Sequence, residues 1–263
     1  MKKTKILALT ATAILLLAAL LTFGYINRNR EAREPYEPAP TIVKIEPPEE
    51  PLYIEEPIEE IVRERQWILR EEIAQLRQYY NNDDIVGYLY IEGTSISYPV
   101  VQSDDNVFYL YHDIHKARNV TGWIFLDYEN DIMEENRNTI IYGHNMRQDI
   151  QFHSIRRFFD REFFDNHRYI TFNTAYGEYR WEIFSFYHTS IDFFYIQVDF
   201  ETDDEFYELL AEMKARSMHE SGLEVGEGDR VLTLSTCAND HVNNRLVVNA
   251  RLIQETDITV YTP

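Results

Sequence analysis

Eight short runs of strand-forming residues, separated by turn residues, set the strongest limit on how this chain can fold. Many short strands favour a closed antiparallel barrel, because closure removes the unpaired edges of a sheet. A single cysteine excludes an intramolecular disulfide, so packing of an aromatic-rich core of about 200 residues must stabilise the domain. The predicted strands are 85–91, 96–101, 122–126, 138–142, 168–173, 178–188, 230–236 and 245–253.

Three helical segments should lie at the periphery of this mainly β domain. The first runs from Pro57 to Tyr80. The second covers about 151–164 and is rich in Phe and Arg. The third begins at Thr202-x-x-Glu205, a capping box, and is inserted before the strand that ends at the cysteine. The apolar residues of the first and third helices recur at helical spacing, so both should pack on the domain. These residues are Ile58, Val62, Leu69, Ile73, Leu76 and Tyr80, then Phe206, Leu210 and Met213.

The N-terminal part divides into three segments before the folded domain at 58–263. Residues 1–5 are basic, and residues 6–27 contain no charge and are long enough to span a bilayer as a helix. A poor cleavage site favours an uncleaved anchor over a signal peptide. Residues 28–57 hold seven of the nine prolines and many glutamates, as expected of an extended linker. We expect a single-pass cell-membrane protein with a cytoplasmic N-terminus and an extracellular domain.

The net charge of −20 argues against nucleic-acid binding, which requires a basic surface. No His/Cys spacing suggests zinc, and no Asp-x-Asp-x-Asp-Gly loop suggests calcium. We therefore expect no metal and no cofactor.

The last two strands place a thiol beside a guanidinium. Cys237 shares one face of its strand with Val231, Thr233 and Ser235, while Arg245 opens the next strand eight residues later. A short polar loop between them indicates an antiparallel pair. Cys237 and Arg245 should then be neighbours on the face turned away from the core.

A histidine completes the parts of a thiol acyl-transfer site. His144 follows the short apolar run Ile140-Ile-Tyr-Gly, and an imidazole can protonate a leaving amine and deprotonate an incoming nucleophile. A charged arginine favours the thiolate and can stabilise an oxyanion. The alternative from the residues alone is a buried structural cysteine, because sequence cannot show that the three groups meet.

These residues resemble sortases, and specifically class B sortases, the membrane-anchored cysteine transpeptidases of Gram-positive bacteria. The resemblance is carried by Thr233-Leu-Ser-Thr-Cys237, Tyr142-Gly-His144-Asn-Met146 and Arg245, in the family's order. It extends from Ile58 to Ile253 through Gly87-Tyr-Leu-Tyr-Ile, Tyr98-Pro-Val-Val-Gln102, Asp105-Asn106, Tyr109-Leu110 and Gly122-Trp-Ile-Phe-Leu-Asp127. The resemblance implies a closed eight-stranded barrel, with an N-terminal helix and a helix inserted before the cysteine strand.

The resemblance also implies roles for individual residues. Cys237 is the expected nucleophile, His144 the general acid/base and Arg245 the oxyanion stabiliser. Asp240 is a candidate for orienting the histidine, although the loop that carries it looks short for the class, and His241 is expected to be an ordinary loop residue. Residues expected to bind substrate, with the backbone N–H of the last in the oxyanion hole, are Asn106, Leu110, Tyr195, Ile196, Ser235 and Ala238.

By this resemblance the chain should cleave a C-terminal LPXTG-like sorting signal of a surface protein or pilin after Thr. The acyl group would pass to an amine of a lipid-linked peptidoglycan precursor or of a pilin lysine. Two alternatives are a hydrolase with water as acceptor and a non-catalytic, membrane-tethered peptide-binding module.

Overall fold

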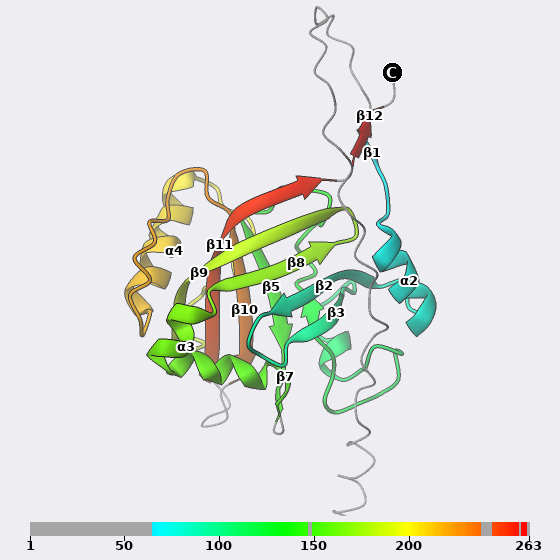
Figure 1. Cartoon of the computed structure of the whole chain (residues 1–263), viewed down its shortest axis with the longest axis horizontal. Coiled ribbons are helices and arrows are strands. Elements are labelled where there is room, and N and C mark those ends of the chain that lie inside the picture. Colours follow the sequence, from blue (N-terminus) through cyan, green and yellow to red (C-terminus); the bar gives the residue numbers. More distant parts are fainter. Residues whose placement is uncertain (1–64, 147–148, 238–243, 258, 262–263) are drawn as a thin grey trace, which may run out of the picture. The chain divides into compact units, whose positions relative to one another are not determined.

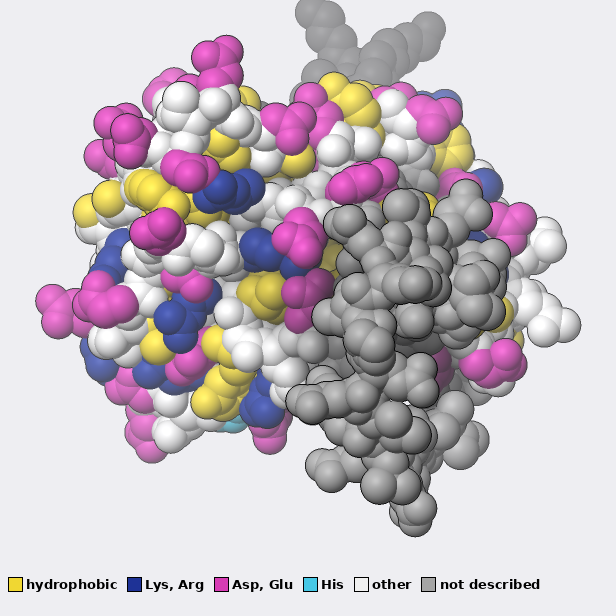
Figure 2. Space-filling model, turned by 90° about the horizontal axis from the view of Figure 1, so that it is seen from above, with side chains coloured by type: hydrophobic (Ala, Val, Ile, Leu, Met, Phe, Trp, Pro, Cys, Tyr) yellow, Lys and Arg dark blue, Asp and Glu magenta, His cyan; other side chains and the backbone are white. Residues whose placement is uncertain are grey.

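The computed structural model describes residues 65–146, 149–237, 244–257 and 259–261. The predictions for 1–5, 6–27 and 28–57 lie outside these ranges. Within them, no helix is long and apolar enough to cross a membrane. Figure 2 shows acidic side chains interspersed with basic ones over the described surface of one face.

Within the described residues, eight strands form a closed barrel in the order β10-β11-β9-β8-β2-β3-β4-β5 (Figure 1). The closed eight-stranded barrel is therefore confirmed. The strands are β2 (Ile85–Ile91), β3 (Ser97–Val101), β4 (Phe125–Leu126), β5 (Asn138–Gly143), β8 (Tyr169–Thr174), β9 (Gly177–Ser190), β10 (Val231–Cys237) and β11 (Asn244–Asp257).

The expectation of an all-antiparallel barrel is wrong at two places. β3 pairs with β4, and β5 with β10, in parallel. Alternation of side chains identifies a strand but not the direction of its partner, and the connection from β5 to β10 is long enough to allow either direction. The parallel pairing puts the C-terminal ends of β5 and β10 at the same end of the barrel.

The strand predicted at 122–126 is shorter than expected, since only Phe125–Leu126 pair as β4. Trp123 and Ile124 are nevertheless buried, and the indole N–H of Trp123 donates to the Pro99 carbonyl at 2.9 Å. Gly122 has a φ of +53°, a left-handed conformation that interrupts a strand. These apolar residues therefore fill the core from a segment that is not itself a strand.

The first predicted helix begins later than its apolar spacing suggested. Helix α2 spans Glu71–Tyr80 and buries Ile73, Leu76 and Tyr80. Arg65–Trp67 instead form strand β1, paired with β12 (Thr259–Tyr261) near the end of the chain. Pairing with a distant segment overrides the local helical pattern there, and residues 58–64 lie outside the described ranges.

The helix predicted at 151–164 is divided in two. A 3-10 helix, η2 (Phe152–Phe159), is followed by α3 (Arg161–Asn166). The break is at Asp160, which has an extended backbone. The Asp160 side chain caps α3 by accepting a hydrogen bond from the Phe163 N–H at 2.9 Å. A short hairpin of β6 (Asn145–Met146) and β7 (Ile150–Gln151) precedes η2.

Helix α4 (Asp203–Arg216) lies between β9 and β10, as expected, and begins at the predicted Thr202 cap. The Thr202 hydroxyl accepts from the Glu205 N–H at 3.3 Å, and the Glu205 carboxylate accepts from the Glu201 N–H at 2.9 Å. The helix and the segment before it cover the outer side of β9, β10 and β11 (Figure 1). The buried cluster between them contains Phe184, Tyr187, Tyr195, Phe206, Leu210, Met213, Val231 and Val247.

This cover changes the surroundings predicted for the cysteine strand. The face of β10 that carries Val231, Thr233 and Ser235 is turned away from the barrel interior but is buried, as is the opposite face. The strand therefore runs between two apolar layers. Its polar side chains on this face must find partners within the protein.

Candidate active site

Strand β10 lies between the two strands that carry the other candidate catalytic residues. Cys237 pairs directly with Arg245 of β11, which confirms the predicted antiparallel pair. On its other side, Thr236 pairs with Gly143 of β5. His144 follows Gly143 just as Cys237 follows Thr236. The register therefore brings the backbones of positions 144, 237 and 245 together at one end of the barrel.

The backbone of His144 is fixed by residues of the next hairpin. Its N–H donates to the Gln151 side-chain oxygen at 2.9 Å, and its carbonyl accepts from the Phe152 N–H at 3.0 Å. The Gln151 amide also donates to the carbonyls of Thr121 and Gly122, at 2.9 and 3.2 Å. Gln151 was not identified from the sequence. Gln151 can be recognised only in the structure, where it is buried and has a φ of +53°, an uncommon conformation for a residue other than glycine.

The imidazole of His144 is half-buried against the 108–122 segment. Its Nε2 atom is buried and makes no hydrogen bond of regular geometry with the described residues. Burial lowers the pKa of His144 from its usual 6.5, and the adjacent backbone of Leu110 opposes this shift. A Cβ atom at Gly122 would lie 2.9 Å from Nε2, so a side chain at this position would collide with the ring. Burial therefore favours the neutral form of this imidazole.

Arg245 is half-buried at the start of β11. Its Nη1 atom donates to the carbonyl of Asn244 at 3.0 Å, and its backbone pairs with Thr189 of β9. A guanidinium retains its charge throughout the physiological pH range. It therefore supplies a fixed positive charge beside position 237.

Ser235 and Tyr195 form a buried contact two residues before the cysteine. The Tyr195 hydroxyl lies 2.7 Å from the Ser235 hydroxyl, and the two residues are 4% and 3% exposed. The Asn138 amide donates to the carbonyls of Tyr195 and Gln197, at 3.2 and 2.9 Å. Ile196 is half-buried and packs against the same cluster. The segment before α4 is thus attached to β5 and β10 through buried hydrogen bonds.

Asn106 and Leu110 lie on the opposite side of β5, in the segment that leads to β4. The Asn106 amide donates to an Asp127 carboxylate oxygen at 3.0 Å, and its own oxygen accepts from the Tyr128 N–H at 3.1 Å. Leu110 ends the 3-10 turn η1 (Phe108–Leu110), beside His144. Ala238, Asp240 and His241 fall in 238–243, outside the described residues.

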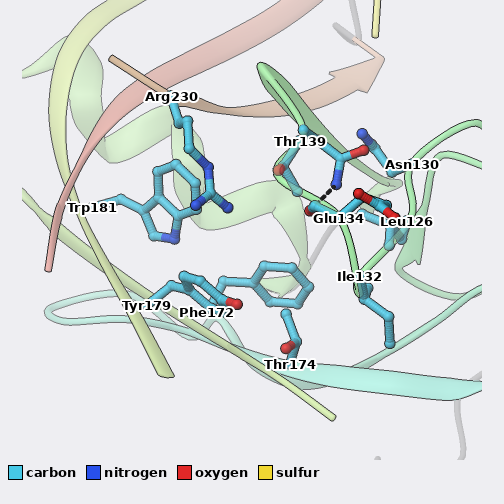
Figure 3. Close-up of a pocket in the computed structure, with 11 residues that line it drawn as sticks. Leu126, Asn130, Ile132, Glu134, Thr139, Phe172, Thr174, Tyr179, Trp181 and Arg230 are labelled. Carbon is cyan, nitrogen blue, oxygen red and sulfur yellow. Dashed lines mark hydrogen bonds between the residues drawn. The ribbon is translucent and has the colours of Figure 1, made fainter. Parts of the chain in front are cut away.

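A separate hollow lies at the other end of the barrel. It adjoins Arg230 and Thr139, at the starts of β10 and β5, so it is about 20 Å from Cys237 along the strand. The space, together with the solvent that reaches it, is about 320 Å³. Figure 3 shows its lining residues: Leu126, Asn130, Ile132, Glu134, Asn136, Thr139, Phe172, Thr174, Tyr179, Trp181 and Arg230. This hollow is not part of the candidate active site.

Comparison with known proteins places this chain in one family. The sortase domain matches residues 89–253. Sortase B of Listeria monocytogenes serovar 1/2a is 36% identical over 187 residues, which cover 70% of this chain and 75% of the relative. Sortase B of Staphylococcus aureus is 31% identical over 253 residues, which cover 94% of this chain and 97% of the relative.

Solved structures agree with these relatives. Sortase B from B. anthracis in complex with AAEK1 matches with a TM-score of 0.66 and 38% identity, over 73% of this chain and 88% of that one. A Staphylococcus aureus sortase B-substrate complex matches with a TM-score of 0.66 and 35% identity, over 71% and 87%. A sortase is a cysteine transpeptidase, and in this barrel the strand that ends at Cys237 lies between β11, which carries Arg245, and β5, which His144 follows. The chain belongs to the sortase family, and within it to class B.

Proposed function

We propose that this class B sortase cleaves a C-terminal LPXTG-like sorting signal after its threonine and transfers the acyl group to an amine. The register at the active-site end supports this proposal, because Cys237 is paired with Arg245 and lies beside the strand that leads to His144. A nucleophile, an acid/base and a fixed cation are the three groups that acyl transfer through a thioester requires.

In the first half of the reaction, the thiolate of Cys237 attacks the threonine carbonyl carbon and forms a C–S bond. Arg245 and the backbone N–H of Ala238 stabilise the resulting oxyanion. The C–N bond to the following residue then breaks, and protonated His144 gives its proton to the departing amine. The products are a thioacyl enzyme, a free C-terminal fragment and a neutral imidazole.

In the second half, an amine attacks the thioester carbonyl and neutral His144 takes its proton. The C–S bond breaks, which releases the joined product and restores the thiolate and imidazolium, the active form of the site even where only a minor fraction of the molecules carries it. The acceptor is an amine of a lipid-linked peptidoglycan precursor or of a pilin lysine. Surface proteins or pilins that bear a sorting signal supply the acyl group.

The proposal includes attachment to the cell membrane through residues 6–27, with the catalytic domain outside the cell. The uncharged apolar run at 6–27 and the Pro/Glu-rich linker after it support this location. Such a tether would keep the active site near lipid-linked acceptors.

Intact-mass spectrometry of the full-length chain in mild detergent, mixed with a panel of sorting-signal peptides, tests the proposal. A mass increase equal to the N-terminal peptide fragment is expected, and it should be absent from a Cys237→Ala variant. His144→Gln should slow formation of the adduct by several orders of magnitude, whereas His115→Gln, at an exposed histidine whose ring lies against Tyr80 of α2, should not.

Added amines then distinguish transfer from hydrolysis. A product that contains the amine supports the transpeptidase, while peptide acid alone at every amine concentration supports the hydrolase. If no peptide gives an adduct although the thiol reacts with iodoacetamide, the peptide-binding module becomes the better description.

A further inference from the structure

Asp127 is a buried carboxylate on which three hydrogen-bond donors converge beside the active site. It follows β4 and is 2% exposed. One carboxylate oxygen accepts from the Tyr142 hydroxyl at 2.7 Å and from the Asn106 amide at 3.0 Å. The other accepts from the Glu129 N–H at 3.0 Å. Asp127 thereby links β4, β5 and the segment that carries Asn106.

One of the two side-chain partners of this carboxylate, Tyr142, lies close to the candidate catalytic residues. Tyr142 pairs with Ser235 of β10 and precedes His144 by two residues. Asn106 and Tyr142 are both half-buried, so each retains surface that a ligand can reach. Because both bond the same oxygen atom, their polar groups lie close together.

The carboxylate also decides which atoms these two side chains can offer. An ionised carboxylate only accepts hydrogen bonds. Tyr142 therefore donates its single hydroxyl proton to Asp127, and the Tyr142 oxygen remains available as an acceptor. Burial, followed by the charge of Asp127, raises the pKa of Tyr142 and keeps the phenol protonated. Asn106 is held with its nitrogen toward Asp127 and its oxygen toward the Tyr128 N–H, which leaves the second amide proton as a donor.

We propose that Asp127 is a positioning residue for the sorting-signal peptide, because it orients Asn106 and Tyr142 to present one donor and one acceptor to an amide group of that peptide. A backbone amide, or the carboxamide of a side chain, carries the complementary carbonyl and N–H. This inference rests on the proposed function and on the expectation that Asn106 is one of the residues that bind the peptide.

The Asp127→Leu change would remove this control. A leucine side chain has a similar volume but no hydrogen-bond acceptor, so the Tyr142 hydroxyl and the Asn106 amide both lose their partner. Asn106 would turn or lose its bond, and Tyr142 would be free to donate elsewhere. The peptide would meet a wall with the wrong donor and acceptor pattern, while Cys237, His144 and Arg245 would be unchanged in sequence.

Peptide affinity and turnover of full-length Asp127→Leu test the proposal. Calorimetric titration in a Cys237→Ala background should show a Kd at least ~10-fold higher than that of the parent, the expected effect of losing about one well-placed hydrogen bond. In the active protein KM should rise similarly while kcat changes by less than ~3-fold, which a lost binding contact predicts. The rate of Cys237 alkylation by iodoacetamide, which needs no peptide, should not change.

Asp84→Leu is a matched control. The Asp84 carboxylate also accepts from a buried tyrosine, Tyr109, at 2.6 Å, and it is paired with Lys116 at 2.8 Å. Its replacement perturbs a similar Tyr–Asp bond outside the candidate groove, so stability should fall while peptide Kd stays the same.

Tyr142→Phe provides a second test that leaves Asp127 intact. A set of peptides in which one backbone N–H at a time is replaced by an ester oxygen should contain one member that binds the parent several-fold more weakly, because it lacks a donor for Tyr142. That ester should cause no further loss in Tyr142→Phe.

The possible failures can be told apart. Unchanged Kd and KM in Asp127→Leu, with normal acyl transfer by the parent, would overturn the positioning role alone. Equal losses of alkylation rate and kcat would also overturn it, since Asp127 would then support the catalytic residues or the fold. If the parent neither binds nor is acylated by any peptide, the proposed function fails and the positioning role fails with it.

Discussion

Cys237, the last residue of β10, pairs directly with Arg245 at the start of β11. The neighbouring pair on the other side of β10 joins Thr236 to Gly143, so His144 leaves β5 at the same level. Three residues from two distant parts of the sequence thus reach one end of the barrel through strand register alone. Backbone hydrogen bonds of a closed sheet are rigid, which suits a site that must hold its reacting groups within a fraction of an ångström.

Replacing Arg245 by alanine should lower kcat/KM by ~10²–10³-fold, because one charged oxyanion donor is lost. The thermal midpoint should change little, since Arg245 is half-buried at the end of a strand. Peptide cleavage assays measure the loss. Arg251→Ala is the control on the same strand, opposite Val231 at the far end of β10, and it should keep normal activity. Equal losses in the two variants would contradict an oxyanion role for Arg245.

Gly122→Ala should reduce activity by ~10²-fold or more through displacement of the His144 ring. The added Cβ would lie 2.4 and 2.7 Å from the Tyr109 and Leu110 carbonyl oxygens and 2.9 Å from His144 Nε2. The positive φ of Gly122 also disfavours a side chain. Activity and urea unfolding should be measured together, with Gly226→Ala as control, because nothing lies within 4 Å of a Cβ there. Normal kcat in folded Gly122→Ala would separate the ring position from catalysis.

Tyr195→Phe should destabilise the protein by about 1–2 kcal/mol, because it leaves the buried Ser235 hydroxyl without its partner. It should also raise KM for the peptide, as the segment before α4 loosens from β10. Tyr187→Phe is the matched control, since the buried Tyr187 hydroxyl has no hydrogen-bond partner among the described residues. That change should be neutral or stabilising. Chemical denaturation compares the two, and a larger cost for Tyr187→Phe would contradict this assignment.

The lowered pKa of His144 predicts a pH-dependent contribution to stability. The pKa of His144 in the folded state lies below 6.5, which is its usual value in an unfolded chain. Between the folded-state pKa and 6.5, the unfolded chain therefore binds more protons than the folded one. The free energy of unfolding should therefore fall as the pH drops from about 7.5 through this window, relative to His144→Gln, which does not titrate. Urea unfolding of both proteins at a series of pH values measures the difference. If the parent instead gained stability relative to His144→Gln as the pH falls, a negative partner would be raising the pKa of His144.

Much of the domain follows from local sequence. Alternating apolar residues identified seven of the barrel strands closely, Thr202-x-x-Glu205 located the start of α4, and the short loop after Cys237 predicted its pairing with Arg245. Each of these features depends on residues close together in the chain. The roles expected for Cys237, His144 and Arg245 and for the substrate-binding residues remain predictions.

Contacts between distant segments decided the rest. Local pattern could not show that β5 and β10 run parallel, which is what brings His144 to Cys237 across 93 positions of sequence. The hydrogen bond that the His144 N–H donates to the Gln151 side chain likewise joins separate elements, as does the convergence of Asn106 and Tyr142 on Asp127. The extent of α2 was misjudged because β1 pairs with β12.

The sequence by itself determined the class of fold, the candidate reactive groups and the ends of the strands near which they lie, because side-chain periodicity and turn chemistry act over a few residues. Only the tertiary structure decided which strands are neighbours, in which direction they run and which polar groups are buried together. Those choices depend on closing the barrel as a whole, where every strand must find two partners at once.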